Sequence, residues 1–197
     1  MHKLKSVEPA PIRPDEVRDY VEGMYAAFHN DVAAHHHERW ERLLEPERTL
    51  VLRDRGRVVA GCGIFSRRLA VPGGEVPLAG VTLVGVRPTH RRRGILRASM
   101  EQLFRDAVDN GEPLAALYAS EAAIYGRFGY GLATHLLALN AESGRIAFRD
   151  DPGRQGAVRL VDEEEAYERF PPIYESLRTE RAGMLSRSEH WWRRHRL

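Results

Sequence analysis

The segment at residues 81–100, VTLVGVRPTHRRRGILRASM, restricts the fold of this chain more than any other. It begins as a largely apolar run that predicts a strand, and from Gly94 onward its spacing predicts an amphipathic helix. Three consecutive arginines precede that glycine. A strand that enters a helix through a glycine turn directs backbone N–H groups and the positive end of the helix dipole at one point. We therefore expect a turn that holds an anion such as a diphosphate, and the arginines strengthen this expectation.

The glycine spacing excludes two common phosphate-binding turns. A dinucleotide-binding turn shows GxGxxG, a nucleoside-triphosphate loop shows GxxxxGK followed by Ser or Thr, and neither pattern occurs here. Residues 91–96, RRRGIL, instead resemble the (Arg/Gln)-x-x-Gly-x-(Gly/Ala) turn of the GNAT acetyltransferases, which wraps the pyrophosphate of coenzyme A. Leu96 departs from the small residue usual in that family. Taken alone, the basic run is equally compatible with a solvated loop that precedes a helix.

A second motif follows at residues 114–131, LAALYASEAAIYGRFGYG. Residues 114–119 predict a strand, Ser120 opens a short helical segment, and two glycines precede an apolar run at 132–139 that we expect to be another strand. Residues 125–130 resemble the Tyr-x-x-x-Gly-(Phe/Tyr) motif after the fifth strand of GNAT enzymes. In that family the tyrosine hydroxyl lies near the thioester sulfur. Two motifs in the correct order and separation favour this superfamily over a solvated basic loop.

The whole chain resembles one branch of this superfamily, the Eis family of bacterial acetyltransferases. The segments PTHRRRGIL, ALYASE and IYGRFGYG carry the resemblance, together with VPGGEVPLAGVTLVGV before the turn. The resemblance implies a catalytic GNAT domain over residues 1–150. Over residues 151–197 it implies a linker and the incomplete beginning of a second GNAT-like domain, with the boundary at the polar stretch 150–156. Full-length members continue into a third domain, so we expect this chain to be a truncated piece or a shortened relative.

The order of the expected elements fits a mixed α/β layering. Strands are expected at 4–9, 48–53, 57–66, 76–86 and 114–119, and helices from Pro14, over 33–44 and over 94–109. The resemblance implies the GNAT acyl-CoA N-acyltransferase fold. In that fold a central, mostly antiparallel sheet is splayed between strands four and five and flanked by helices.

The resemblance also implies the chemistry, which is direct transfer of an acetyl group from acetyl-CoA to a primary amine by an N-acetyltransferase. Tyr125 is implied to be the general acid that protonates the leaving thiolate; the alternative is a packed aromatic residue in a short helix. A backbone N–H of residues 84–86 is implied to polarise the thioester carbonyl, as an oxyanion hole does. The residues implied to bind the cosubstrate are Val84, Gly85, Val86, Arg91, Arg92, Arg93, Gly94, Ile95, Leu96 and Ser120.

The acceptor pocket is implied by the same resemblance, because Eis relatives take aminoglycosides and other multi-amine compounds in a deep, partly acidic cleft. Asp31 stands where the family has a pocket carboxylate, Trp40 matches a pocket tryptophan, and Leu83 and Tyr118 occupy positions that line the cleft. A carboxylate attracts ammonium groups, and an aromatic face adds a cation–π contact. The alternatives are a solvated or helix-capping acid for Asp31 and core packing between helices for Trp40.

The sequence does not assign the general base, the group that removes a proton from the attacking amine. In Eis relatives the carboxylate at the end of the third domain enters the active site, and we do not transfer that role to Leu197. Glu121 and Asp31 are the substitutes considered, acting directly or through water. The alternative function is a catalytically impaired acyl-CoA-binding module or regulatory fragment. Turnover with aminoglycosides, polyamines or lysine peptides distinguishes the two functions.

Composition and charge exclude several other classes. The net charge of +2 is too small for nucleic-acid binding by bulk attraction, and no apolar run has the length of a signal peptide or a membrane span. We expect an amine substrate, small or peptidic, and neither a nucleic-acid nor a membrane partner, while a homo-oligomer stays open. The single cysteine, Cys62, cannot form an intrachain disulfide and favours the reducing cytoplasm.

Two clusters in the sequence resemble binding sites, but we do not assign a binding function to either. His35, His36 and His37 are consecutive on a predicted helix, so their side chains point about 100° apart and cannot converge on one ion; we expect no metal. Trp191 and Trp192, followed by basic residues, resemble a nucleic-acid or membrane patch. We interpret them instead as a helix end of the second domain, and we expect an exposed apolar patch there.

Overall fold

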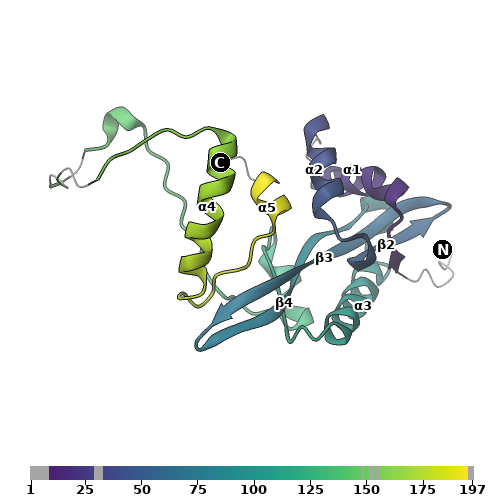
Figure 1. The fold of residues 1–197 in the computed structure, drawn as a ribbon. Coiled ribbons are helices and arrows are strands. Elements are labelled where there is room, and N and C mark those ends of the chain that lie inside the picture. Colours follow the sequence, from purple (N-terminus) through teal and green to yellow (C-terminus); the bar gives the residue numbers. More distant parts are fainter. Residues whose placement is uncertain (1–8, 29–32, 148, 151–152, 154–155, 195–197) are drawn as a thin grey trace.

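The computed structural model describes residues 9–28, 33–147, 149–150, 153 and 156–194, and a five-stranded sheet lies at the centre of this part (Figure 1). The strands, in spatial order, are β1 (Ala10–Pro11), β2 (Thr49–Asp54), β3 (Arg57–Val71), β4 (Gly74–Val86) and β5 (Leu114–Leu117). The first three pairings are antiparallel, and β4 with β5 is parallel. The predicted mixed, mostly antiparallel sheet is confirmed. The strand expected at 4–9 falls mainly on residues outside the described part.

Helices cover both faces of the sheet. A 3-10 turn, Pro14–Glu16, leads into α1 (Val17–Ala27), which lies with α2 (Ala34–Leu43) on one face, while α3 (Ile95–Asp109) covers the other (Figure 1). Alternate residues of each strand point to opposite faces. Val51 and Phe65 accordingly pack in the cluster under α1 and α2, whereas Leu50 and Ile64 pack with residues of α3. The core is therefore two apolar layers, one on each side of the sheet.

Two paired glycines let α1 lie close to the sheet. Gly61 of β3 pairs with Gly85 of β4. A Cβ atom on Gly61 would lie 2.5 Å from a ring carbon of Tyr20, and one on Gly85 would lie 2.5 Å from the sulfur of Met24. Both of these α1 side chains are fully buried. A larger residue at either glycine would push α1 away from the sheet.

The middle of β4 contains a β-bulge. Gly61 pairs with Gly85 and Gly63 pairs with Thr82, so Leu83 and Val84 together lie opposite the single residue Cys62. Leu83 has a φ of +47°, in the left-handed region that non-glycine residues rarely adopt. Bulges of this kind bend a strand and re-aim its backbone groups. The bulge lies just beyond the last β4 residue that pairs with β5, which is Val81.

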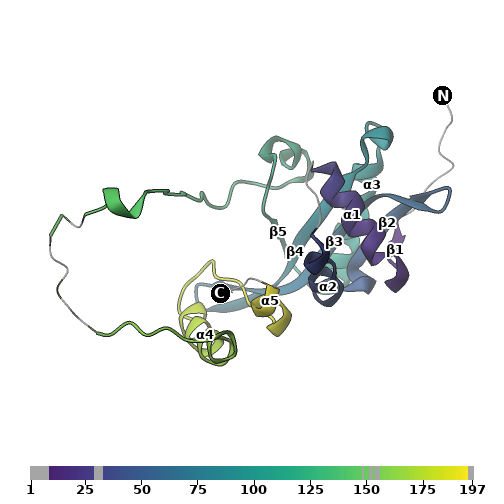
Figure 2. The same cartoon turned by 90° about the horizontal axis from the view of Figure 1, so that it is seen from above.

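The strand expected at residues 132–139 is wrong for this structure. The segment is extended but unpaired, and its four leucines are 73–85% exposed. In the view from above, the segment runs away from the sheet toward the left (Figure 2). A strand requires a partner for its backbone N–H and C=O groups, and in the described part of the chain no strand pairs with this segment.

The C-terminal part returns to the long β3–β4 hairpin. Residues 163–194 contain α4 (Glu163–Arg178) and α5 (Glu189–Arg194), which lie beside the distal half of the hairpin (Figures 1 and 2). A β-bridge joins Leu69 to Leu185, and the guanidinium of Arg178 lies 2.8 Å from the carboxylate of Glu75. The hairpin strands extend farther than the sequence predicted. This extension provides the surface on which the C-terminal part packs.

The expectation of an exposed tryptophan patch is wrong for the same reason. The ring of Trp191 packs edge-on against Phe65 at 5.7 Å between centroids, with the guanidinium of Arg67 4.4 Å from its centre. Trp192 is 8% exposed and packs edge-on against Tyr174. Both indoles are thus covered by residues of this chain. The domain boundary at 150–156, part of which lies outside the described residues, stays a prediction.

Candidate functional site

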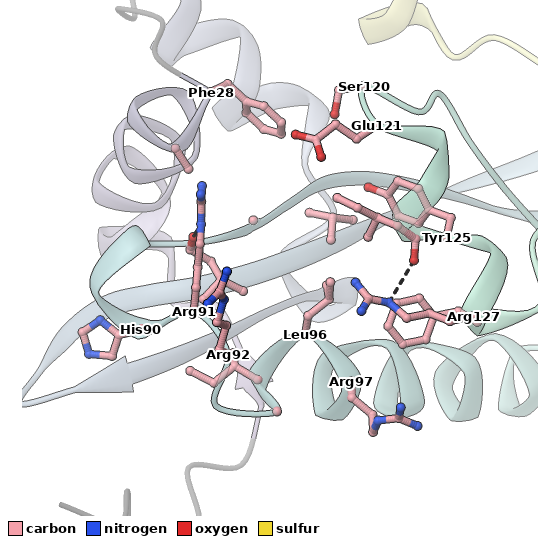
Figure 3. A pocket seen from close by; sticks show the side chains of 18 residues that line it. Phe28, His90, Arg91, Arg92, Leu96, Arg97, Ser120, Glu121, Tyr125 and Arg127 are labelled. Atoms are coloured by element: carbon pink, nitrogen blue, oxygen red, sulfur yellow. Dashed lines mark hydrogen bonds between the residues drawn. The ribbon is translucent and has the colours of Figure 1, made fainter. Parts of the chain in front are cut away.

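A cavity of about 430 Å³ opens where β4, α3 and the segment after β5 meet (Figure 3). The end of α1 closes one side of it. The lining residues are 27–28, 84–86, 90–92, 94–97, 120–121, 124–125 and 127–128. Both motifs singled out in the sequence therefore face one space, although almost thirty residues of chain separate them.

The turn before α3 gives the cavity an anion-binding wall. Positive φ angles at Arg92 (+62°) and Gly94 (+78°) fold the backbone sharply before the helix begins. The amide of Ala98 donates to the Gly94 carbonyl oxygen at 3.1 Å, as in the first turn of a helix. The preceding amides, including those of Ile95 and Leu96, have no acceptor within α3. These amides and the positive end of the helix dipole make the wall suited to a phosphate group.

Arginine side chains add positive charge around this wall. The arginines that line the cavity are Arg91, Arg92, Arg97 and Arg127. The Nε of Arg91 donates to the Val86 carbonyl oxygen at 3.3 Å, and the Nε of Arg127 donates to the Ile124 carbonyl oxygen at 3.0 Å, the bond dashed in Figure 3. Each of these two guanidinium groups is therefore held by one hydrogen bond from its Nε to a backbone carbonyl oxygen. Their remaining N–H groups suit an anion that spans more than one phosphate.

Glu121 is the single carboxylate among the described residues that line the cavity. Figure 3 shows Glu121 and Ser120 near the ring of Phe28, at the opposite end of the cavity from His90 and Arg92. The cavity therefore has a cationic end and an end with one carboxylate and one aromatic ring. Such a charge distribution suits an anionic molecule at the first end and a cationic one at the second.

Tyr125 lines the cavity beside Glu121 and Arg127 (Figure 3). The residue is half-buried, and its ring packs edge-on against Tyr130 with centroids 5.8 Å apart. Burial raises the pKa of the Tyr125 phenol, and the nearby Glu121 carboxylate raises it further. The phenol consequently carries its proton at neutral pH, which is the state a proton donor requires.

Most of the predicted cosubstrate residues come together in this cavity. Those that line it are Val84, Gly85, Val86, Arg91, Arg92, Gly94, Ile95, Leu96 and Ser120, together with Tyr125. Arg93 does not line it, and its guanidinium donates to the Thr89 carbonyl oxygen at 3.0 Å. The side chain at position 93 thus braces the turn, while its neighbours at 91 and 92 face the cavity.

Three of the predicted acceptor residues do not line the cavity. Trp40 is 4% exposed, stacks on Phe65 and donates its Nε1 hydrogen to the Tyr25 hydroxyl at 3.0 Å. Leu83 packs against the buried cluster under α1, and Tyr118 is 84% exposed. None of these three lines the cavity, and Asp31 lies outside the described residues. Their acceptor roles stay predictions, and the alternative of core packing agrees with the position of Trp40.

Sequence reasoning missed seven residues that line the cavity: Ala27, Phe28, His90, Arg97, Ile124, Arg127 and Phe128. Helical spacing could have found Arg97, which lies in the first turn of α3, and Arg127 lies inside the motif that begins with Tyr125. His90 directly precedes the turn, and its Nε2 lies 3.1 Å from a carboxylate oxygen of Asp54. No local pattern points to Phe28, because its place in the cavity depends on how α1 packs.

No metal centre is found within the described part of the chain, where no three His, Cys, Asp or Glu side chains could hold an ion together. His37 is buried, with its Nε2 3.5 Å from the Glu22 carboxylate. The side chains of His35 and His36 lie outside the part of the chain that the structure describes. No helix in the described ranges has the length and apolar character needed to cross a bilayer.

Comparison with known proteins finds relatives over most of the chain. An uncharacterized N-acetyltransferase of Streptomyces avermitilis is 40% identical over 161 residues, which are 81% of this chain and 39% of the relative. The N-acetyltransferase Eis of Mycobacterium bovis is 41% identical over 176 residues, which are 85% of this chain and 44% of the relative. The crystal structure of Eis1 from Mycobacterium abscessus superposes with a TM-score of 0.75 at 32% identity, covering 97% of this chain and 47% of that one.

These comparisons agree with the geometry of the cavity. The chain spans less than half the length of each of these relatives. The resemblance to Eis acetyltransferases that the motifs predicted is confirmed at about 40% identity. The acetyltransferase (GNAT) domain family matches residues 8–133, a range that includes both motifs and every lining residue of the cavity. The chain therefore belongs to the acetyltransferase (GNAT) domain family.

Proposed function

We propose that this chain is the catalytic, acetyl-CoA-binding part of an N-acetyltransferase that transfers an acetyl group directly to a primary amine. One observation carries the proposal. The amino end of α3 with its arginines and the protonated phenol of Tyr125 line the same cavity. An anion-binding wall positions a phosphate-bearing donor, and a nearby phenol supplies a proton to its leaving group.

The residues present fit acetyl-CoA as a substrate. A pyrophosphate suits the amides at the start of α3 and the side chains of Arg91 and Arg92. A Cβ atom on Gly94 would meet nothing within 4 Å, so the approach to these amides is open. The backbone of residues 84–86 lines the cavity beside them and offers N–H groups to an extended amide-bearing chain. Bound acetyl-CoA supplies a thioester, whose carbonyl carbon is open to attack by an amine.

The protein contributes three functions to the transfer. A backbone N–H of residues 84–86 polarises the thioester carbonyl, and Tyr125 donates a proton to the departing sulfur. The third function is removal of a proton from the attacking amine. Glu121, a cavity carboxylate, is the first candidate for this base, directly or through water, and Asp31 is the second.

The acceptor is proposed to be an amine that carries positive charge at neutral pH. Glu121 and the ring of Phe28 at one end of the cavity suit an ammonium group by charge and by cation–π attraction. The class of compound stays a proposal: the Eis resemblance favours an aminoglycoside, a polyamine or a lysine side chain. A cytoplasmic setting is also proposed, supported by the single buried thiol of Cys62.

Substitution of Tyr125 tests the function. The chain is incubated with acetyl-CoA and a panel of aminoglycosides, polyamines and lysine peptides, and release of free thiol is followed. Tyr125→Phe removes the proton donor, so we expect turnover to fall about tenfold or more while acetyl-CoA affinity changes less than about twofold. Tyr167→Phe is the matched control, because its hydroxyl bonds Glu163 on α4, outside the cavity.

Two outcomes contradict the proposal. Equal turnover in the wild type and in Tyr125→Phe removes the proposed proton donor. Binding of acetyl-CoA with no thiol released for any amine favours the alternative, which is an impaired acyl-CoA-binding module. Calorimetric titration with acetyl-CoA separates these results, because it measures binding without chemistry.

A further inference from the structure

The bulge in β4 places a leucine in an unfavourable backbone conformation next to the cavity. Leu83 has a φ of +47°, and the next residue, Val84, lines the cavity. A left-handed conformation at a non-glycine residue persists only where the surrounding structure holds it, and such residues concentrate at functional sites. A specific contact is therefore expected to hold the bulge.

Tyr20 makes that contact from α1. Its hydroxyl donates a hydrogen bond of 2.8 Å to the Leu83 carbonyl oxygen, across 63 residues of sequence. The residue has no exposed surface, and its ring lies directly over Gly61, where a Cβ atom would be 2.5 Å away. Burial raises the pKa of the Tyr20 phenol well above its usual value, so the hydroxyl stays a donor.

The direction of this bond matters because a peptide unit is planar. The carbonyl of Leu83 and the N–H of Val84 belong to one trans peptide and point in opposite directions. Fixing the Leu83 oxygen on the α1 side therefore fixes the Val84 N–H on the side away from Tyr20. We propose that Tyr20 is a positioning residue for acetyl transfer, which sets the orientation of the Val84 amide in the cavity. This inference rests on the proposed function, in which a backbone N–H of residues 84–86 polarises the thioester.

Substitution of Tyr20 by phenylalanine tests the inference with little change in packing. Tyr20→Phe keeps the ring over Gly61 and removes only the hydroxyl. The matched control is Tyr174→Phe. In the wild type the Tyr174 hydroxyl donates to the Leu185 carbonyl oxygen at 2.7 Å, and neither residue lines the cavity. Turnover is divided by the concentration of acetyl-CoA-binding sites from calorimetric titration, so that loss of folded protein does not count as loss of catalysis.

A positioning role predicts a split between rate and binding. We expect kcat per binding site to fall about fivefold or more in Tyr20→Phe, with acetyl-CoA affinity changed less than about threefold and the control unchanged. A smaller fall in kcat, or an equal fall in the control, overturns the inference. Replacing Tyr20 with 4-aminophenylalanine keeps a donor at the same place, and it should restore most of the rate if the hydrogen bond is the cause.

A second measurement does not depend on activity. Amide hydrogen exchange, followed by NMR without ligand, should show Val84 exchanging about tenfold faster in Tyr20→Phe than in the wild type or the control. An unchanged Val84 amide overturns the inference even if the wild type is active. If the wild type binds acetyl-CoA but releases no thiol, the proposed function fails, while this amide measurement still decides whether Tyr20 holds the bulge.

Discussion

Replacing Gly94 with alanine separates the role of the turn backbone from the stability of the fold. Gly94 has a φ of +78° immediately before α3, and a Cβ atom there would meet nothing within 4 Å. The cost of an alanine is therefore conformational and not steric. Gly56, in the turn between β2 and β3, has a φ of +79° and equally open space. It provides a control with the same backbone requirement outside the cavity.

The two substitutions should cost similar stability but differ in binding. An L-residue held in the left-handed region costs about 1–2 kcal/mol, so both variants should lose about that much free energy of unfolding. In Gly94→Ala the turn also shifts to accommodate the alanine, and this shift rotates the amides at the start of α3 out of position. Loss of one charge-assisted hydrogen bond to a phosphate costs roughly 1.5–3 kcal/mol, which weakens coenzyme A binding roughly 10- to 100-fold.

Urea unfolding and calorimetric titration with coenzyme A measure the two effects. We expect Gly56→Ala to bind coenzyme A within about twofold of the wild type, because its turn has no part in the cavity. Gly94→Ala should bind more weakly at equal stability. If both variants are destabilised alike and both bind like the wild type, the backbone of this turn does not hold the diphosphate, and the reasoning from helix geometry is refuted.

Three further predictions concern contacts around the sheet. Hydrogen bonds from Arg53 lower the pKa of Glu16 from 4.5 to about 2. Because the folded-state pKa is the lower one, the contribution of the pair to stability is complete above about pH 4.5, and roughly 3 kcal/mol of it is lost as the pH falls toward 2, which urea unfolding at several pH values measures. Glu112→Gln leaves the buried guanidinium of Arg48 without its counter-charge and should cost about 3 kcal/mol by thermal unfolding, and a double variant with apolar residues at both positions should regain most of it. Trp191→Ala removes the ring that anchors the C-terminal part on the hairpin, so hydrogen exchange in the distal half of the hairpin should accelerate.

The grouping of the proposed cosubstrate residues in one cavity could be predicted from sequence because their arrangement is local. A strand, a glycine turn and a helix within twenty residues determine where the amides at the start of α3 point. The motif around Tyr125 likewise carries its own turn at Gly129, whose φ is +89°. For these residues, neighbours in sequence are also neighbours in the cavity.

The residues at the other end of the cavity could not be predicted in the same way. Trp40 and Leu83 match positions of a known family, but their surroundings depend on how α1 and α2 pack on the sheet. Trp40 lies in that packing layer beside Phe65, so its ring is unavailable to the cavity. Phe28, which does line the cavity, gives no signal in the sequence because only the end of α1 brings it there. Long-range packing decides these positions.

The strand expected at 132–139 shows the same limit. Its apolar residues satisfy the pattern of a strand, yet the pattern specifies only that the segment needs a partner, not that one is present. In the described part of the chain β5 is one of the two edge strands, and Leu136 and Leu137 are 77% and 80% exposed. An exposed run of leucines of this length is unusual for a soluble surface. Pattern and exposure together indicate a segment whose partner is not among the described elements.

The place where β4 and β5 separate connects the fold to the proposed chemistry. Their parallel pairing ends at Val81 and Leu117, and two residues farther along β4 the bulge begins at Leu83. Beyond this point no described strand covers the β5 side of β4, while residues 84–86 line the cavity. An uncovered strand edge accepts an extended chain that carries amides, and acetyl-CoA has such a chain between its diphosphate and its thioester. In the proposed function the separation therefore serves twice, once to expose the strand edge and once to admit the thioester. A continuous β4–β5 ladder would cover that edge and separate Tyr125 from the proposed thioester.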